Sequence, residues 1–403
     1  MIGLNKMDFK MDKNQQGTKL YTIALFIWVT YFGSVITSNV ATYLNNNILQ
    51  YGVSGLVIAM LVIKEYLNIP SGQIRIRPFT FAVFLVMFSL YIWTSRYQSG
   101  ILTVCIFLFV ASARDVELNA IFKAFLWAIT IVLVGTILLS RLGLISILYM
   151  ASDDGVRGSL GFKYVSFGSQ YSLFFILCYL IIRSSKIRWI ELIFLYIIVF
   201  YFHSATATSN PFYLSLLVIT YALISEKVVK KGLIVENQFL KIITPAIYFV
   251  VLGVLLYLCF FASSGIYSTV DSMVHNRLRL GKQGIELFGV PMLGQKVTFT
   301  TLNMFNRYDS NYNYIDSSYL QSLVVNGWLF TVLILILFSL SLKWVVDHKY
   351  DILAACMVIA AIHGMFDPQM MVLWYSPFIL MIGKIFNPSD TGKKLAQRYI
   401  EDV

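Results

Sequence analysis

Long apolar runs follow one another along this chain, separated by short polar segments. Within each run the apolar residues are continuous and do not alternate with polar ones, which is typical of helices in lipid rather than of barrel strands. A helix needs roughly 17–25 apolar residues to cross a bilayer. The pattern therefore predicts an all-α polytopic membrane protein of about twelve spans. These are 20–39, 48–67, 79–95, 99–113, 119–140, 166–182, 188–203, 207–225, 239–262, 317–342, 350–366 and 369–386.

Composition agrees with lipid as the solvent. Of the 403 residues, 58% are hydrophobic and 13% are charged, and the mean hydropathy is +0.74. A soluble globular protein carries about a quarter charged residues. The four cysteines all fall inside apolar runs and lack the spacing of metal ligands, so we expect them to serve in packing.

The net charge of +11 is better explained by membrane topology than by nucleic-acid binding, because the cations lie in short loops between apolar runs. If the N-terminus is cytoplasmic, 22 of the 31 lysines and arginines lie on the inner side. We therefore expect a cytoplasmic segment over 1–19, one transmembrane domain over 20–386 and a cytoplasmic tail over 387–403. The longest polar interruption, residues 263–316, then becomes a large extracytoplasmic loop.

Five of the nine outer cations lie in this loop against the general charge bias, and three of them, Arg277, Arg279 and Lys282, stand close together. An arginine offers a planar set of donors that matches phosphate and stays charged at any physiological pH. We therefore expect anion binding here. A single predicted helix over 270–287 would splay the two arginines apart, so they need not hold the same group.

Farther along the loop the sequence becomes rich in tyrosine and asparagine. Tyr312, Asn313 and Tyr314 are suited to sugar rings, by stacking and by hydrogen bonds to hydroxyls. The alternative is a belt of aromatic residues at the membrane interface.

Three ionisable residues near the predicted membrane surface are candidates for proton transfer or substrate binding. Asp316 precedes an apolar run, where it is either a helix N-cap or a carboxylate at the mouth of a site. His363 ends an apolar span, where an ionisable group is costly, and Asp367 lies four residues later. They share a face if helical turns continue through Gly364. Asp367-Pro368 is also an ordinary start for a further helix.

Other polar stretches carry weaker signals. Arg157 lies in a glycine-rich segment, where anion binding and a surface turn at the lipid headgroups are equally good interpretations. His203 precedes small hydroxylated residues, which could hydrogen-bond a sugar, but packing of helices is the favoured interpretation. Asp115 and Glu117 are interpreted as a solvated charge cluster on the cytoplasmic side. The outer loops hold no Asp-x-Asp motif, so no metal or other cofactor is expected.

Four short motifs resemble those of the Wzy family of polysaccharide polymerases, within the O-antigen polymerase and ligase superfamily. They are RGSLGF at 157–162, RLRL at 277–280 followed by GIELFG at 284–289, IDSSYLQSLVVNGWLF at 315–330, and HGMFDPQ at 363–369. The resemblance extends over about residues 20–385. It implies a glycosyltransferase that joins oligosaccharide repeat units into surface polysaccharide, such as capsule or exopolysaccharide, outside the cytoplasmic membrane. The implied partners are an undecaprenyl-pyrophosphate-linked oligosaccharide and membrane lipid, with a flippase and chain-length regulators as further candidates; nucleic acid is not among them.

In that reaction the pyrophosphate leaving group develops charge, which fixed cations stabilise. Arg157 and Arg277 are the first candidates for this role, and Arg279 is the next. Related ligases begin the segment equivalent to 316–330 with a His-Asn pair, whereas this chain has Asp316. The proton acceptor therefore stays open between Asp316, His363 and His275.

Three other functions compete with this interpretation. An O-antigen ligase would use related chemistry on another acceptor. A flippase for lipid-linked oligosaccharides would show short outer loops and two related halves, and this chain has one dominant loop. A membrane scaffold or sensor would have no need for clustered arginines.

Overall fold

The computed structural model describes residues 2–68, 78–95, 100–152, 155–300 and 312–386, and the predicted tail over 387–403 lies outside them. The described chain is mostly helical and divides into two compact units. Of the described residues, the first unit comprises 2–68, 78–81, 104–152, 155–230 and 373–386, and the second comprises 82–95, 100–103, 231–300 and 312–372.

Eight described helices are long and apolar enough to cross a membrane. They cover 15–37, 47–67, 118–141, 167–186, 189–206, 209–229, 238–260 and 328–347, and two shorter apolar helices cover 82–94 and 351–363. The all-α membrane architecture is thus confirmed in outline, while the count of twelve spans stays a prediction.

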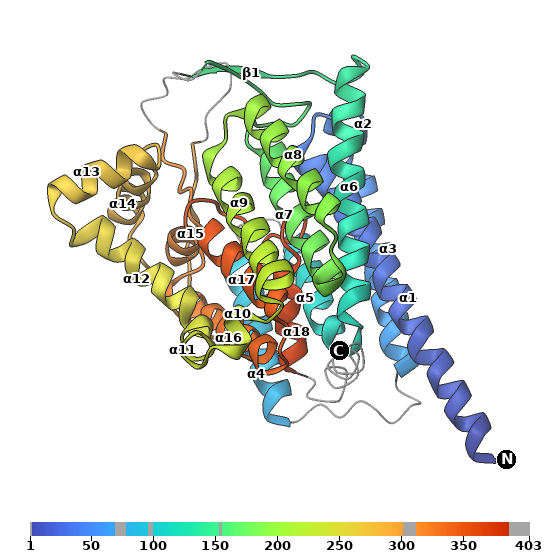
Figure 1. Cartoon of the computed structure of the whole chain (residues 1–403). Helices are drawn as coiled ribbons and strands as arrows, with labels where there is room; N and C mark the ends of the chain where they lie inside the picture. The colour runs from blue at the N-terminus through green and yellow to red at the C-terminus, as the bar shows by residue number, and fades with distance from the viewer. Residues whose placement is uncertain (1, 69–77, 96–99, 153–154, 301–311, 387–403) are drawn as a thin grey trace. The chain divides into compact units, whose positions relative to one another are not determined.

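The first unit is built around long helices that the apolar pattern predicted. α1 packs against both α3 and α6, and α6 leads into the α7–α8–α9 group (Figure 1). Trp28 of α1 is fully buried and lies between Phe109 and Trp374, with ring centroids 5.8 and 6.0 Å away. The elements are α1 (Ile2–Thr37), α2 (Ala41–Leu44), α3 (Asn47–Asn68), α5 (Gly100–Ser112, which begins in the second unit), η2 (Ala113–Asp115), α6 (Leu118–Arg141), β1 (Tyr149–Ser152), β2 (Gly155–Gly158), α7 (Phe167–Arg183), η3 (Ser184–Lys186), α8 (Trp189–Thr206), α9 (Ser209–Leu223), η4 (Ile224–Val229), η6 (Pro377–Met381) and α18 (Ile382–Ile385).

A buried ionic cluster in this unit corrects one expectation. Lys64 is 1% exposed and makes ion pairs with Glu65 and Asp115, and Arg114 pairs with Glu65. Lys384 of α18 donates to the carbonyl of Val116 next to this cluster. The interpretation of Asp115 as a solvated charge is therefore wrong, because a buried lysine needs an anionic partner.

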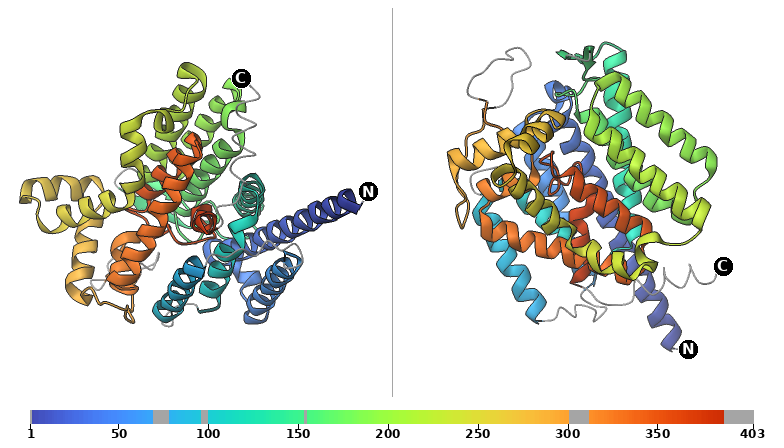
Figure 2. Two further views of the ribbon diagram at one scale, coloured as in Figure 1. Left: turned by 90° about the horizontal axis from the view of Figure 1, so that it is seen from below. Right: turned by 60° about the vertical axis from the view of Figure 1, so that its left-hand side comes forward.

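The second unit consists of shorter and interrupted helices. α12 leads into α13, and α14 packs back against α12 (Figure 2, yellow to gold). The elements are α4 (Pro78–Ser95, which begins in the first unit), α10 (Leu233–Glu236), α11 (Gln238–Ile243), η5 (Thr244–Ala246), α12 (Ile247–Phe260), α13 (Ser264–Met273), α14 (Arg277–Phe288), α15 (Ser318–Val325), α16 (Trp328–Asp347) and α17 (Asp351–His363). α13 and α14 replace the single helix predicted over 270–287, because His275 and Asn276 take left-handed conformations between them.

The continuous span predicted over 317–342 is wrong. Gly327 has a φ of +90° and separates α15 from α16. A side chain at Gly294 would meet the Val325 carbonyl at 2.7 Å, so the 289–295 segment lies directly against this break. Trp328 N and Leu329 N donate to the carbonyls of Pro291 and Met292 and fix the break in place.

The helix predicted over 369–386 is also wrong. Residues 370–376 form turns, and helical structure resumes only in the short η6 and α18. Pro368 and Pro377 each lack a backbone N–H, which disfavours a continuous helix through this region. Asp367 consequently does not cap a helix, and its carboxylate is available for other contacts.

Two glycines set how closely α14 approaches the start of α15. A side chain at Gly281 would meet Leu320 Cδ1 at 2.6 Å, and one at Gly284 would meet the side chain of Ile315 still more closely. Ile315 and Leu320 are themselves 0% and 1% exposed. The glycine pair therefore holds the loop helix against the segment that carries Asp316.

Replacing Gly284 by valine is expected to lower the melting temperature in detergent, because the added methyl groups compete with Ile315 for the same space. Overpacking of this kind costs about 1–3 kcal/mol. The control is Gly253→Val on α12, since nothing lies within 4 Å of a Cβ added at Gly253. Equal melting temperatures for the two variants would mean that α14 does not rest on Ile315.

Candidate functional site

Polar side chains from three places in the second unit meet at one end of its helices. They come from the first residue of α14, from the segment that leads into α15, and from the end of α17 with the turn that follows it. These elements are labelled in Figure 1. The residues involved are Arg277, Tyr314, Asp316, Ser318, His363, Asp367 and Gln369. This group is called the Arg277 cluster below.

Arg277 is placed by the turn between α13 and α14. The carboxylate of Asp271, itself 7% exposed, accepts a hydrogen bond from Arg279 N at 3.0 Å and so fixes the first turn of α14. Arg277 then donates to the carbonyl of Phe366, and its NH1 lies 3.4 Å from Asp367 Oδ2. The Arg277 side chain is 22% exposed, against 5% for the Asp367 side chain. It therefore has a buried anionic neighbour and a partly open side.

His363 and Asp367 come together as their spacing suggested. α17 ends at His363, turns continue through Gly364, and His363 Nδ1 lies 3.6 Å from Asp367 Oδ2. The other ring nitrogen, Nε2, lies 3.4 Å from Gln369 Oε1. The ring is 1% exposed, so both of its nitrogens face protein groups.

Ser318 joins the start of α15 to the end of α17. Its hydroxyl donates to the Asp367 carbonyl at 2.7 Å and accepts from Met370 N at 3.0 Å. Its backbone N donates to the Gly364 carbonyl at 2.9 Å, and Tyr319 adds a hydrogen bond to Ala361. Because these bonds hold the 364–370 turn from one side, Asp367 keeps a fixed position relative to Arg277.

Asp316 is not a helix cap. Ser317 is the N-cap of α15, and its side chain accepts from Leu320 N at 3.4 Å. Burial raises the pKa of Asp316 to about 6, with Arg277 lowering it and Asp367 raising it further. The charges of Arg277 and Asp367 therefore both act on the Asp316 carboxyl group. With this pKa, the group changes its protonation state near neutral pH.

The tyrosine-rich segment contributes one side chain to the cluster. Burial raises the pKa of the Tyr314 phenol, and the charges of Asp316 and Asp367 raise it further. Its ring packs edge-on against Phe299, with centroids 5.2 Å apart. Tyr312 is half-buried two residues earlier.

Asn313 has a structural role. Its side-chain oxygen accepts from Thr300 N at 2.7 Å, and its amide donates to the Thr298 carbonyl at 3.4 Å. These bonds tie the two ends of the loop together across residues 301–311, which lie outside the described residues. Binding of sugar by Asn313 stays a prediction that would compete with these bonds.

Two predicted residues lie at the surface. His275 and Arg279 are both exposed, one just before α14 and one on its first turn. Arg279 is near enough to the Tyr267 phenol of α13 to affect its pKa, and thus faces a different neighbour from Arg277. The two arginines thus have different neighbours, and the expectation that they hold different groups stays a prediction.

Arg157 belongs to the first unit and stabilises a turn there. It lies on β2, opposite Met150, and its Nε donates to the Thr206 carbonyl at 2.7 Å. Its NH2 lies 3.3 Å from the Thr208 hydroxyl, so the hairpin is anchored on the turn between α8 and α9. A role of Arg157 in holding an anion stays a prediction. His203, nearby on α8, stacks on Phe212 at 3.9 Å, which fits its interpretation as a packing residue.

Sequence reasoning missed Asp271, Ser318 and Gln369. Asp271 shortly precedes the two arginines in the sequence, and Gln369 belongs to the same short motif as His363. Both could have been found by considering polar residues that are close in sequence to the predicted site residues. Ser318 gave none, because a serine at a helix start is usually only a cap.

The cluster combines a positive group, two carboxylates and a histidine at a partly open position. Such a set can bind an anion and accept a proton within one site. Among the described residues, no three His, Cys, Asp or Glu side chains are grouped as metal ligands would be. No protein-family profile, no curated protein and no solved structure matches this chain.

Proposed function

We propose that this protein is a polysaccharide polymerase that uses an undecaprenyl-pyrophosphate-linked oligosaccharide as donor. The observation that carries the proposal is the Arg277 cluster, in which the partly exposed Arg277 side chain pairs with Asp367 and its charge acts on a second carboxyl group, Asp316, whose pKa is about 6. Arg277 suits a diphosphate, and Asp316 suits proton acceptance near neutral pH. The motif resemblance of residues 277–289, 315–330 and 363–369 to Wzy polymerases points to the same chemistry.

In the proposed reaction, a hydroxyl of the acceptor repeat unit attacks the anomeric carbon of the donor glycan. The bond from that carbon to the diphosphate oxygen breaks, and the diphosphate leaves with the electron pair. Arg277 stabilises the charge that develops there. Asp316 takes the hydroxyl proton, and Asp367 holds Arg277 in place through the 3.4 Å contact. His363 Nδ1 lies 3.6 Å from the same Asp367 oxygen, Oδ2, and so helps to hold this carboxylate in place.

The course of the helices in the second unit supports an extracytoplasmic site. α12 and α17 run toward the cluster, and α16 runs away from it. The start of α12 and of α17 and the end of α16 therefore lie at the opposite end of the unit. The lysines near that end are Lys231, Lys241, Lys343 and Lys349. Lysines gather on the cytoplasmic side of membrane proteins. With these lysines on the cytoplasmic side, the proposal has the Arg277 cluster on the outer face, where lipid-linked repeat units would be joined.

A flippase for lipid-linked oligosaccharides is the second candidate, favoured by the break between α15 and α16. Transporters often place half-helix N-termini at their binding sites, and α15 begins beside Asp316. A ligase would use the same groups on another acceptor.

A deletion strain separates these functions. Loss of a polymerase is expected to leave surface glycan as a single repeat unit, visible as one band in place of a ladder on electrophoresis. Accumulation of lipid-linked units inside the cell would instead indicate a flippase. Full-length chains that stay unattached to their normal acceptor would indicate a ligase.

The purified protein provides the direct test. In liposomes that contain a lipid-linked repeat unit, it is expected to produce a ladder of longer glycans and to release undecaprenyl pyrophosphate. The proposal includes no metal, so the ladder is expected to persist in EDTA. Absence of longer products with a donor that supports growth in vivo would contradict the proposal.

A further inference from the structure

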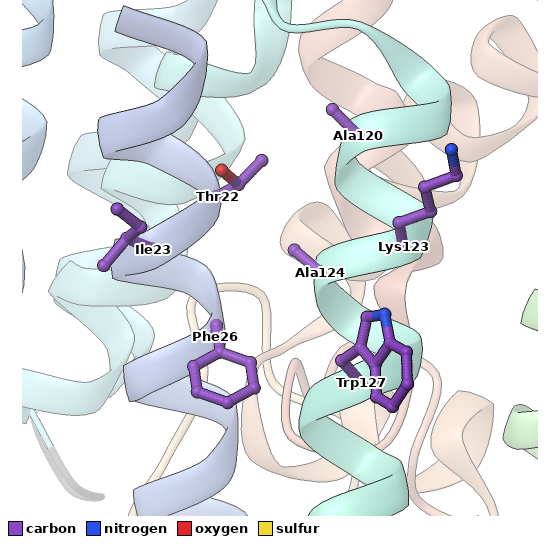
Figure 3. A pocket seen from close by; sticks show the side chains of 7 residues that line it. All are labelled: Thr22, Ile23, Phe26, Ala120, Lys123, Ala124 and Trp127. Atoms are coloured by element: carbon purple, nitrogen blue, oxygen red, sulfur yellow. The ribbon is translucent and has the colours of Figure 1, made fainter. Parts of the chain in front are cut away.

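An open groove of about 360 Å³ lies between α1 and α6 in the first unit (Figure 3). Thr22, Ile23 and Phe26 line it from α1, and Ala120, Lys123, Ala124 and Trp127 line it from α6. Ala120 and Ala124 are one helical turn apart, so together they leave the space that larger side chains would fill. The groove belongs to neither the Arg277 cluster nor the Arg157 turn.

α1 and α6 run in the same direction. The groove therefore has a polar end near the start of both helices and an apolar end farther along them. Residues 22–26 of α1 lie beside residues 120–127 of α6, and farther along Ser38 accepts a hydrogen bond from Thr136. Both helices begin on the same side of the membrane. Toward the membrane interior, the lining consists of the Phe26 ring, Ala124 and the indole of Trp127.

Lysines stand at the polar end. The Lys123 side chain is exposed, and its amine extends back to the level of Ala120, toward the start of α6 (Figure 3). Lys19 is exposed on α1, four residues before Ile23, and thus lies on the same face one turn earlier. Long lysine side chains near helix ends place their charge at the headgroup level while their methylene groups cover apolar surface.

We infer that this groove binds one anionic phospholipid. Its phosphate lies between Lys19 and Lys123, and one acyl chain lies along Ala120, Ala124, Phe26 and Trp127. The positive charges of Lys19 and Lys123 favour an anionic headgroup. The space left by the small side chains of Ala120 and Ala124 accommodates the acyl chain. Each lysine near a membrane surface contributes an attraction that corresponds to roughly fivefold enrichment of an anionic lipid. The two factors multiply to about 25-fold at most, and screening by salt lowers this, so phosphatidylglycerol is expected to be favoured over phosphatidylcholine by about tenfold.

Tryptophan quenching by brominated lipids tests this inference, because bromine quenches an indole only on contact and Trp127 is 64% exposed in the groove. The full chain is reconstituted in phosphatidylcholine vesicles with a few mole per cent of brominated phosphatidylglycerol or brominated phosphatidylcholine. The Trp127 signal is the difference between the unmodified protein and Trp127→Phe. It is expected to be quenched at about tenfold lower content of the anionic lipid.

The variants separate headgroup selection from chain binding. Lys19→Gln with Lys123→Gln is expected to abolish the preference, while Lys186→Gln, which removes an exposed lysine outside the groove, is expected to retain it. Ala124→Leu is expected to fill the groove and weaken quenching by either lipid. Equal quenching of unmodified protein by the two brominated lipids would overturn the inference, and so would an unchanged preference in the double lysine variant.

Discussion

Cells whose protein carries Arg277→Ala are expected to lose long glycan chains and to retain a single repeat unit, although the protein is still made. Arg277 is the partly exposed cation of the cluster, positioned by the Phe366 carbonyl and by Asp367 Oδ2 at 3.4 Å. Removing one fixed group that stabilises developing charge costs about 10²–10³ in rate. Electrophoresis of surface polysaccharide and a rate measurement on protein in liposomes both report the loss.

Stability is the main alternative explanation of that loss, because removing the arginine leaves Asp367 buried without its cationic neighbour. Arg277→Lys addresses it: the charge stays, but the planar donor fork is lost, so an intermediate rate with a near-normal melting temperature is expected. The matched control is Arg279→Ala, two residues along the same helix and exposed. Normal ladders in Arg277→Ala cells would remove this residue from the mechanism, and equal defects in both alanine variants would point to general charge loss.

Much of the helical framework could be predicted from the apolar pattern, and the failures have specific causes. Long helices such as α1, α6 and α16 follow from continuous apolar runs. The break at Gly327 lies within such a run and depends on the 289–295 segment packing against it, which local sequence does not reveal. The turn from Asp367 to Met370 likewise depends on Ser318, whose hydroxyl donates to the Asp367 carbonyl and accepts from Met370 N.

The candidate site was predictable where residues are close in sequence. His363 and Asp367 stand four apart, and one turn of chain brings them to 3.6 Å. Their meeting with Arg277 and Asp316 joins segments separated by about 40–90 positions along the sequence, and nothing in a single sequence fixes such a contact. The sequence also allowed Asp316 to be a helix N-cap. The structure excludes this interpretation because Ser317 is the N-cap of α15.

Buried charges were misjudged because sequence does not show their partners. Asp115, beside Arg114 and ahead of Glu117, has the local appearance of a solvated patch. It pairs with Lys64, a residue 51 positions earlier that is almost completely buried. The pairing depends on the packing of α3 beside the α5–η2 segment.

Asp316→Asn is expected to lower the polymerisation rate by about 10²–10⁴ and to change its pH dependence, because it removes the proposed proton acceptor. The unmodified protein needs Asp316 ionised, and its pKa is about 6. Between pH 7 and pH 5 the ionised fraction, and with it the rate, falls about tenfold. The variant is expected to lack this decline. Initial rates in liposomes over this pH range are the measurement.

The same substitution is expected to stabilise the folded protein near neutral pH. A carboxyl group whose pKa is raised by folding binds its proton more tightly in the folded state, so its favourable contribution exists at low pH and disappears as the pH rises through about 6. Asn cannot ionise, so the variant should melt at a higher temperature than the unmodified protein at pH 7, and the gap should narrow toward pH 4. Asp347→Asn is the control, since Asp347 pairs with Lys343 at the exposed end of α16. A lower melting temperature for Asp316→Asn at pH 7, with its rate unchanged, would make Asp316 a structural residue and leave His363 as the remaining candidate base in the cluster.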